Sequence, residues 1–278
     1  MKLFKKVLLF TLVIAAALVV AGCRPDNGDK KDKSVLRVGT PGLSGDFVAG
    51  FGSSAYDVYV RDLVHGYGTL VETETGEYVW DTEAVLVDVP KTSTDADGNK
   101  TYTFELQRDL LWNNGEKITA EDYVLTMLLR SSVDWLSIAT SANAGIDLVG
   151  FEKFRYGPEG KATEGYATSL DQRFKGVRLL GTYKFAFTID AANLPYFYET
   201  IMVSSSPIDV ETYLPGFAVK DSSEGAYITK AGATGTLSAT ITESVNDVSK
   251  GQRYNPTVTS GPYQFVRATV GGGAIVEI

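Results

Sequence analysis

The sequence predicts an α/β protein, because segments with the two-residue period of strands occur between segments with helical spacing and helix caps. Tyr102, Phe104 and Leu106 alternate with polar residues, as a strand with one buried face does. Residues 183–189 repeat that alternation with Tyr, Phe, Phe and Ile. Between them, Thr119 precedes an apolar run with helical spacing. The chain therefore mixes strands and helices along its length.

The other predicted elements are shorter and rest on apolar periodicity and on Gly or Pro at their ends. In chain order they are a β-like run at 35–38, a helix at 57–64 with Val60, Leu63 and Val64 on one face, a strand at 85–89 stopped by Pro90, a helix starting at Leu194-Pro195-Tyr196, and a helix starting at Ser206-Pro207-Ile208. Residues 222–249 are rich in Gly, Ala, Ser and Thr and give no clear period.

Two local motifs set boundaries. Thr119 and Asp122 have the spacing of a capping box, which fixes the start of the helix after Thr119. Residues 94–99 carry oxygen-bearing side chains at alternate positions, as a calcium loop does, but the glycine comes one place early and Leu106 stands at position twelve. A hairpin turn on Asp97-Gly98 explains the same residues more simply, so we expect no metal there.

The N-terminus has the order of a lipoprotein signal peptide. Lys2, Lys5 and Lys6 precede an apolar run over 7–20, and Val20-Ala21-Gly22 leads into Cys23. A transmembrane anchor with an incidental cysteine is the alternative, but the run is short for a membrane span. We expect Cys23 to be lipidated on the extracytoplasmic face of a cytoplasmic membrane, at the cell surface in a monoderm or in the periplasm of a diderm.

Three segments follow from this reading. Residues 1–22 are the signal peptide, and residues 23–34 are a polar tether of low hydrophobicity. Residues 35–278 form the folded part.

Charge and composition exclude several classes of function. Without the three lysines of the signal peptide, 23 basic residues face 34 acidic ones, a net charge of −11, which disfavours nucleic-acid binding. Cys23 is the only cysteine and His65 the only histidine, so no disulfide, zinc–thiolate or multi-histidine site is expected. His65 lacks a G-x-S-x-G nucleophile motif, so a structural role is favoured over a catalytic one.

Residues 102–124 carry the most specific motif, YTFELQRDLLWNNGEKITAEDYV. This stretch resembles the signature of family 5 extracellular solute-binding proteins, the peptide-, dipeptide- and nickel-type receptors of ABC importers. Residues 174–197 and the Gly-Pro-Tyr segment within 259–265 fit the same family. The resemblance extends over essentially all of 35–278.

The resemblance implies a fold and a binding surface. The fold is a periplasmic-binding-protein-like lobe (type II, cluster C) with a mixed sheet and an inserted smaller α+β subdomain. Ligand contacts come from loops at the cleft face, and the candidates are Asp46, Phe47, Phe51, Tyr56 and Trp135. Asp46 is equally consistent with a turn residue, and Trp135 with core packing. Trp112 and Asn114-Gly115 are expected to be structural.

The implied function is that of a lipid-anchored receptor that captures oligopeptides, or another small solute, and delivers them to an ABC permease and its ATPase. No catalysis and no cofactor are expected. Family members are about twice as long, so the second lobe is expected to be missing from this chain. A surface receptor or adhesin that does not transport, and a surface lipoprotein hydrolase with two carboxylates, remain alternatives.

Overall fold

The computed structural model describes residue 36 and residues 38–52, 54–139, 144–160, 166–269 and 275–277. The predicted signal peptide, Cys23 and the predicted tether therefore lie outside the described residues. The chain divides into two compact units, Met1–Thr40 and Pro41–Ile278. In the first unit, Leu36 and Val38 are exposed and belong to no strand, while Val35 and Arg37 lie outside the described residues. The strand at 35–38 stays a prediction.

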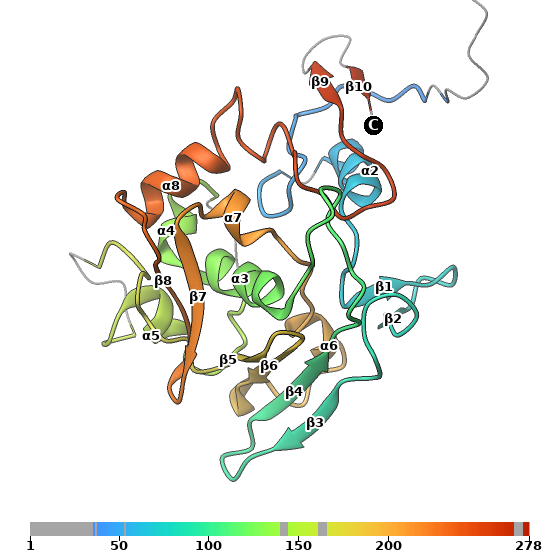
Figure 1. Cartoon of the computed structure of the whole chain (residues 1–278). Helices are drawn as coiled ribbons and strands as arrows, with labels where there is room; N and C mark the ends of the chain where they lie inside the picture. Colours follow the sequence, from blue (N-terminus) through green and yellow to red (C-terminus); the bar gives the residue numbers. More distant parts are fainter. Residues whose placement is uncertain are drawn as a thin grey trace, which may run out of the picture. The chain divides into compact units, whose positions relative to one another are not determined.

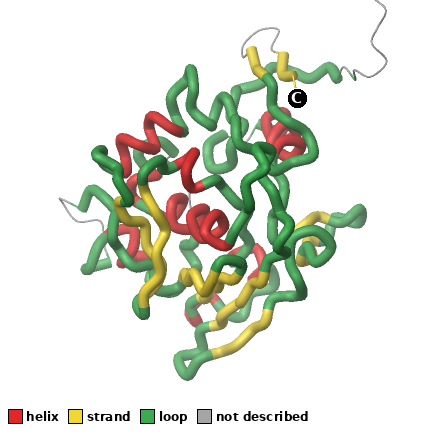
Figure 2. Tube along the Cα trace, in the orientation of Figure 1, coloured by secondary structure: helices red, strands yellow, loops and turns green. Residues whose placement is uncertain are grey.

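The second unit contains all the helices and strands that Figure 1 labels, and Figure 2 colours the same trace by secondary structure. They are α2 (Ala55–Val64), β1 (Leu70–Glu72), β2 (Tyr78–Trp80), β3 (Lys91–Thr94), β4 (Lys100–Glu105), α3 (Ala120–Ser131), α4 (Val133–Leu136), α5 (Phe151–Tyr156), β5 (Val177–Gly181), β6 (Lys184–Ile189), the 3-10 helix η1 (Ala191–Asn193), α6 (Glu199–Met202), α7 (Val210–Tyr213), β7 (Phe217–Ser222), β8 (Gly225–Lys230), α8 (Leu237–Ser244), β9 (Arg267–Thr269) and β10 (Ile275–Glu277).

A four-stranded antiparallel sheet, in the order β3-β4-β6-β5, forms the base of this unit. The two strands predicted from alternation, β4 and β6, are neighbours, and Phe104 lies opposite Phe185. Their rings stack with centroids 4.7 Å apart, and Tyr123 of α3 stacks on Phe185 at 5.4 Å. The alternating residues therefore bury one sheet face against α3.

Helix α3 is buried along almost its whole length and forms the centre of the core (Figure 1). The capping box is confirmed: the Thr119 hydroxyl accepts a hydrogen bond from the helix N-terminus, and the Thr119 N–H donates to Asp122 Oδ2 at 2.8 Å. Trp112 is buried, and Gly115 makes its turn with a positive φ of 87°. These structural roles match the predictions.

The hairpin on Asp97-Gly98 is confirmed as well. Strands β3 and β4 pair directly, and Gly98 has a φ of 86°. The Asp95 carboxylate accepts hydrogen bonds from the N–H groups of Asp97 and Asn99 at 2.9 Å. Its oxygens thus stabilise the turn.

The predicted strand at 85–89 is wrong. A turn begins at Asp81, whose carbonyl accepts hydrogen bonds from the N–H groups of Val85 and Leu86. Leu86 makes one isolated bridge to Leu106, and β3 begins only after Pro90. Val87 and Val89 are more than half exposed, so the valine alternation does not mark a buried face here.

The two predicted proline-led helices begin later than expected. Helix α6 starts at Glu199 rather than at Pro195, and the rings of Tyr196 and Tyr198 contact each other at 6.2 Å. Residues two apart do not share a helical face, so this contact belongs to a turn. Helix α7 starts at Val210, because Asp209 accepts a hydrogen bond from the Thr212 N–H and caps it.

The segment without a clear period, 222–249, contributes the end of β7, all of β8 and α8. The β7–β8 hairpin is joined to α3 by a hydrogen bond from the Val219 N–H to Glu121 Oε1, 3.1 Å long.

The α/β class is confirmed. All strand pairs among the described residues are antiparallel, so the parallel pairing that a mixed sheet requires is not seen within them. Within the described part of the chain, no helix is both long and apolar enough to cross a membrane.

Candidate functional site

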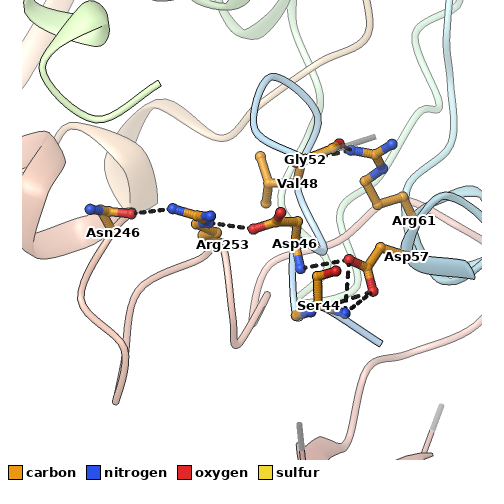
Figure 3. A network of polar contacts seen from close by, with 9 residues as sticks. Ser44, Asp46, Val48, Gly52, Asp57, Arg61, Asn246 and Arg253 are labelled. Atoms are coloured by element: carbon orange, nitrogen blue, oxygen red, sulfur yellow. Dashed lines mark hydrogen bonds and ion pairs between the residues drawn. The ribbon is translucent and has the colours of Figure 1, made fainter. Parts of the chain in front are cut away.

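The loop before α2 is held by one buried carboxylate. Asp57, in the first turn of α2, is fully buried and accepts hydrogen bonds from the backbone N–H groups of Ser44, Gly45 and Asp46 at 3.0–3.4 Å (Figure 3). Hydrogen bonds to a charged acceptor are stronger than neutral ones. This anchor fixes the path of the loop that carries Asp46, Phe47 and Phe51.

Asp46 pairs with a residue far along the chain. Its Oδ1 lies 2.5 Å from Arg253 Nε, and Arg253 Nη1 donates to Asn246 Oδ1 at 2.8 Å (Figure 3). A Cβ on Gly52 would lie 2.1 Å from Asp46 Oδ2, so only glycine leaves this carboxylate its place. In the structure the Asp46 carboxylate is paired with Arg253, and its contact with a ligand stays a prediction.

Phe51 and Trp135 form the aromatic part of the site. The Phe51 ring is 5.4 Å from that of Trp135, and the Arg253 guanidinium stands 4.4 Å from the Phe51 centroid. A guanidinium over an aromatic face is an attractive cation–π contact. The structure therefore brings these two predicted residues together, with Arg253 completing the stack.

Two buried donors beside this stack have no acceptor among the described residues: Trp135 Nε1 and Arg130 Nε. Both face Gly50, since a Cβ there would lie 3.5 Å from Trp135 Nε1 and 3.9 Å from Arg130 Nε. Buried N–H groups are nearly always paired, and an unpaired one is costly. The two donors therefore lie close together, buried, and without an acceptor among the described residues.

The other two predicted contact residues, Phe47 and Tyr56, make their ring contacts outside the Phe51–Trp135 stack. Phe47 is fully buried, and its ring packs at 5.3 Å against Phe265, so it belongs to the interior and not to an open aromatic wall. Tyr56 is half-buried on α2 and makes an edge contact with the exposed ring of Tyr59. Trp135 is also fully buried, so only its N–H edge near Gly50 is chemically distinctive.

The electrostatics around the two donors are positive. The pKa of His65 is lowered to about 4, mainly by burial; Arg130 and Arg61 also lower it, and a 2.9 Å hydrogen bond with the Phe47 carbonyl opposes the shift. Burial also lowers the pKa of Arg130. A neutral His65 and two guanidinium groups give this region a local positive charge in a protein with net charge −8.

Three residues of the site were not predicted: Asp57, Arg130 and Arg253. Asp57 had a detectable signal, since a carboxylate in the first turn of a helix after a Gly-rich loop can bind loop N–H groups. Arg253 and Arg130 gave none, because Asp46 and Gly50, which they lie beside, are far away in sequence. Within the described ranges, no group of three or more His, Cys, Asp or Glu is placed to hold a metal ion.

Solved structures resemble the fold only in part. Listeria monocytogenes OppA bound to peptide is 16% identical, with a TM-score of 0.44, over 68% of this chain and 37% of that one. Lactococcal OppA with an endogenous peptide is 13% identical, with a TM-score of 0.47, over 83% and 35%. Campylobacter jejuni NikZ with Ni(L-His) is 15% identical, with a TM-score of 0.39, over 84% and 32%. The chain spans about a third of the length of each.

Sequence comparison gives the family. No curated protein sequence matches the chain. The family model for the middle region of bacterial extracellular solute-binding proteins of family 5 matches residues 86–277, which include β4, the capping box, Trp135 and Arg253. The chain belongs to the family 5 bacterial extracellular solute-binding proteins.

Proposed function

We propose that this chain is part of a lipid-anchored substrate-binding protein of an ABC importer, which captures oligopeptides or similar solutes outside the cell and delivers them to a permease. Family membership supports solute binding. The observation that carries the peptide assignment is the pair of unpaired donors at Gly50, Trp135 Nε1 and Arg130 Nε. A peptide offers carbonyl and carboxylate oxygens as acceptors, and its apolar side chains suit the neighbouring aromatic stack.

The five predicted residues have different roles in this proposal. Trp135 donates its indole N–H to the ligand, and Phe51 supplies an apolar wall beside it. Asp46 and Phe47 act as positioning residues, since the first holds Arg253 and the second packs in the core. Tyr56, half-buried on α2, is kept as a candidate ligand contact. No catalytic step is part of the proposal.

The indole N–H provides a direct test. The chain has three tryptophans, so three indole signals are expected in an NMR spectrum of the full chain labelled with nitrogen-15. Adding a peptide pool should shift the Trp135 signal and leave that of Trp112 in place. Trp135→Phe removes the donor and should weaken peptide binding about tenfold, because a hydrogen bond to a charged or well-placed acceptor contributes about 1–2 kcal/mol.

Trp112→Phe is the matched control, since Trp112 is also buried but lies outside the Gly50 group. Both variants lose similar apolar volume, and only the first should lose affinity. If no peptide pool shifts the Trp135 signal or raises the unfolding temperature, the peptide assignment is wrong. A peptide that binds without uptake in cells carrying the matching permease would favour a non-transporting receptor instead.

Lipid anchoring is a separate part of the proposal and rests on Cys23 after Val20-Ala21-Gly22. Cells fed a labelled fatty acid should incorporate it into the wild-type chain and not into Cys23→Ala. The variant should also leave the membrane fraction, because at least two acyl chains are needed for stable anchoring. Label incorporation that persists in Cys23→Ala would contradict this part alone.

A further inference from the structure

A concave site lies between the end of α3, the segment after η1, and α6. It has a volume of about 800 Å³. Its distinctive lining residues are Met127, Asp147, Asn193, Tyr196, Tyr198 and Met202. It shares none of the residues of the aromatic stack at Phe51 and Trp135.

Among the described residues of this lining, Asp147 is the only carboxylate and none is basic. Its side chain is half-buried and makes no hydrogen bond or ion pair with the described residues. Burial raises its pKa, with no neighbouring charge to offset that cost. A partly desolvated carboxylate without a partner favours a cation beside it.

The backbone holds Asp147 in place. Its carbonyl accepts hydrogen bonds from the Asp190 N–H at 2.9 Å and from Asn193 Nδ2 at 3.3 Å. The backbone at Asp147 is therefore fixed before any ligand arrives, which lowers part of the entropic cost of binding.

Two aromatic rings add a second, independent feature. Tyr196 and Tyr198 line the pocket with centroids 6.2 Å apart and planes at 63°, so they form a corner. Each is about half exposed, at 51% and 53%, and Tyr198 also packs edge-on against Phe197 with centroids 4.8 Å apart. Ring faces attract cations, and alkylated ammonium groups bind in aromatic corners and cages. The thioethers of Met127 and Met202 suit the apolar part of such a ligand.

We propose that this pocket, formed by Asp147, Tyr196 and Tyr198, binds a small organic cation with an alkylated ammonium group. The carboxylate neutralises the charge, and the two rings surround the methyl groups. The site does not depend on the proposed peptide function, because it uses different residues and a different ligand chemistry.

Tetramethylammonium is the probe, and tert-butanol is its neutral counterpart of similar shape. NMR titration of the full chain should shift amide signals around Asp147 and Tyr198 with tetramethylammonium, at least tenfold more tightly than with tert-butanol. Asp147→Asn keeps the shape and removes the charge, and it should weaken the cation about tenfold without changing tert-butanol binding. Tyr196→Leu, at an exposed ring, should also weaken the cation.

Asp88→Asn is the matched control for net charge, since Asp88 is exposed and distant in sequence from the pocket. It should leave both titrations unchanged. Equal affinity for the two probes, or equal loss in Asp147→Asn and Asp88→Asn, overturns the proposal. A failure of peptide binding at Trp135 with intact tetramethylammonium binding would contradict only the proposed function.

Discussion

His65 is the only histidine of the chain, and its surroundings give stability a defined pH dependence. Its pKa is about 4 in the folded protein and about 6.5 when unfolded. The unfolded chain therefore binds the proton more readily, so the His65 contribution is complete above pH 6.5 and is lost as pH falls toward 4. The loss reaches at most about 3 kcal/mol of unfolding free energy.

The pH dependence of wild-type stability alone does not isolate the His65 contribution, because burial raises the pKa of Asp122 to about 7. That group stabilises the folded protein below its unfolded pKa and loses this effect as pH rises through 7, the opposite slope. The comparison with His65→Gln removes the ambiguity. We expect the difference in unfolding free energy between the two proteins, from urea denaturation, to shrink as pH falls from 7 to 4.5. A difference that does not change with pH would contradict the assigned pKa.

Single residues show where sequence reasoning about the site works and where it does not. Phe51 and Trp135 were predicted from the family resemblance, and the structure brings them into contact. The resemblance also named Asp46 and Phe47, but it gave the partner of neither. Arg253 forms an ion pair with the Asp46 carboxylate, and the Phe265 ring packs against the Phe47 ring. Both contacts join residues more than 200 positions apart, and no local sequence pattern encodes such contacts.

At the scale of elements, the predictions were confirmed where the same apolar pattern determines both the local backbone and the buried face. The alternation in β4 and β6 marks the sheet face that α3 covers, so periodicity and burial agree. At 85–89 the same alternation misled, because the turn fixed by Asp81 determines the backbone and leaves two valines in solvent. The proline-led starts were also wrong: Asp209 caps α7 at Val210, and α6 begins at Glu199 without a side-chain cap.

The capping box at α3 gives the prediction for this scale. Thr119→Ala removes the hydroxyl that accepts a helix N-terminal N–H, and it should lower the free energy of unfolding by about 1 kcal/mol. Thr119→Ser keeps the hydroxyl and should retain most of the stability. Urea denaturation of the three proteins at one pH measures this. Equal stability of the alanine and serine variants would show that the cap contributes nothing.

For the second unit as a whole, the sequence predicts which elements form but not which distant segments meet. The Asp46–Arg253 pair joins the loop before α2 to the segment after α8, at a separation of 207 residues. The Phe47 N–H also donates to the Arg253 carbonyl at 2.8 Å. This connection, formed only in the folded state, positions the Phe51–Trp135 stack.

A double-mutant cycle on Asp46→Asn and Arg253→Met measures that connection. The Asp46 side chain is 7% exposed and that of Arg253 is 23% exposed, so solvent screens the pair little. We expect a coupling energy of about 1–2 kcal/mol in urea denaturation of the full chain. The control is the same cycle on Glu243→Gln and Lys250→Gln, whose ion pair is 2.6 Å long but 70% and 59% exposed. Water and salt screen that pair and both side chains stay mobile, so its coupling should be too small to measure. The cycle cancels the contacts of Arg253 with Phe51 and Asn246, because these are lost whether or not Asp46 is present. Similar coupling energies in the two cycles would therefore mean that Arg253 stabilises the loop through Phe51 and Asn246 alone.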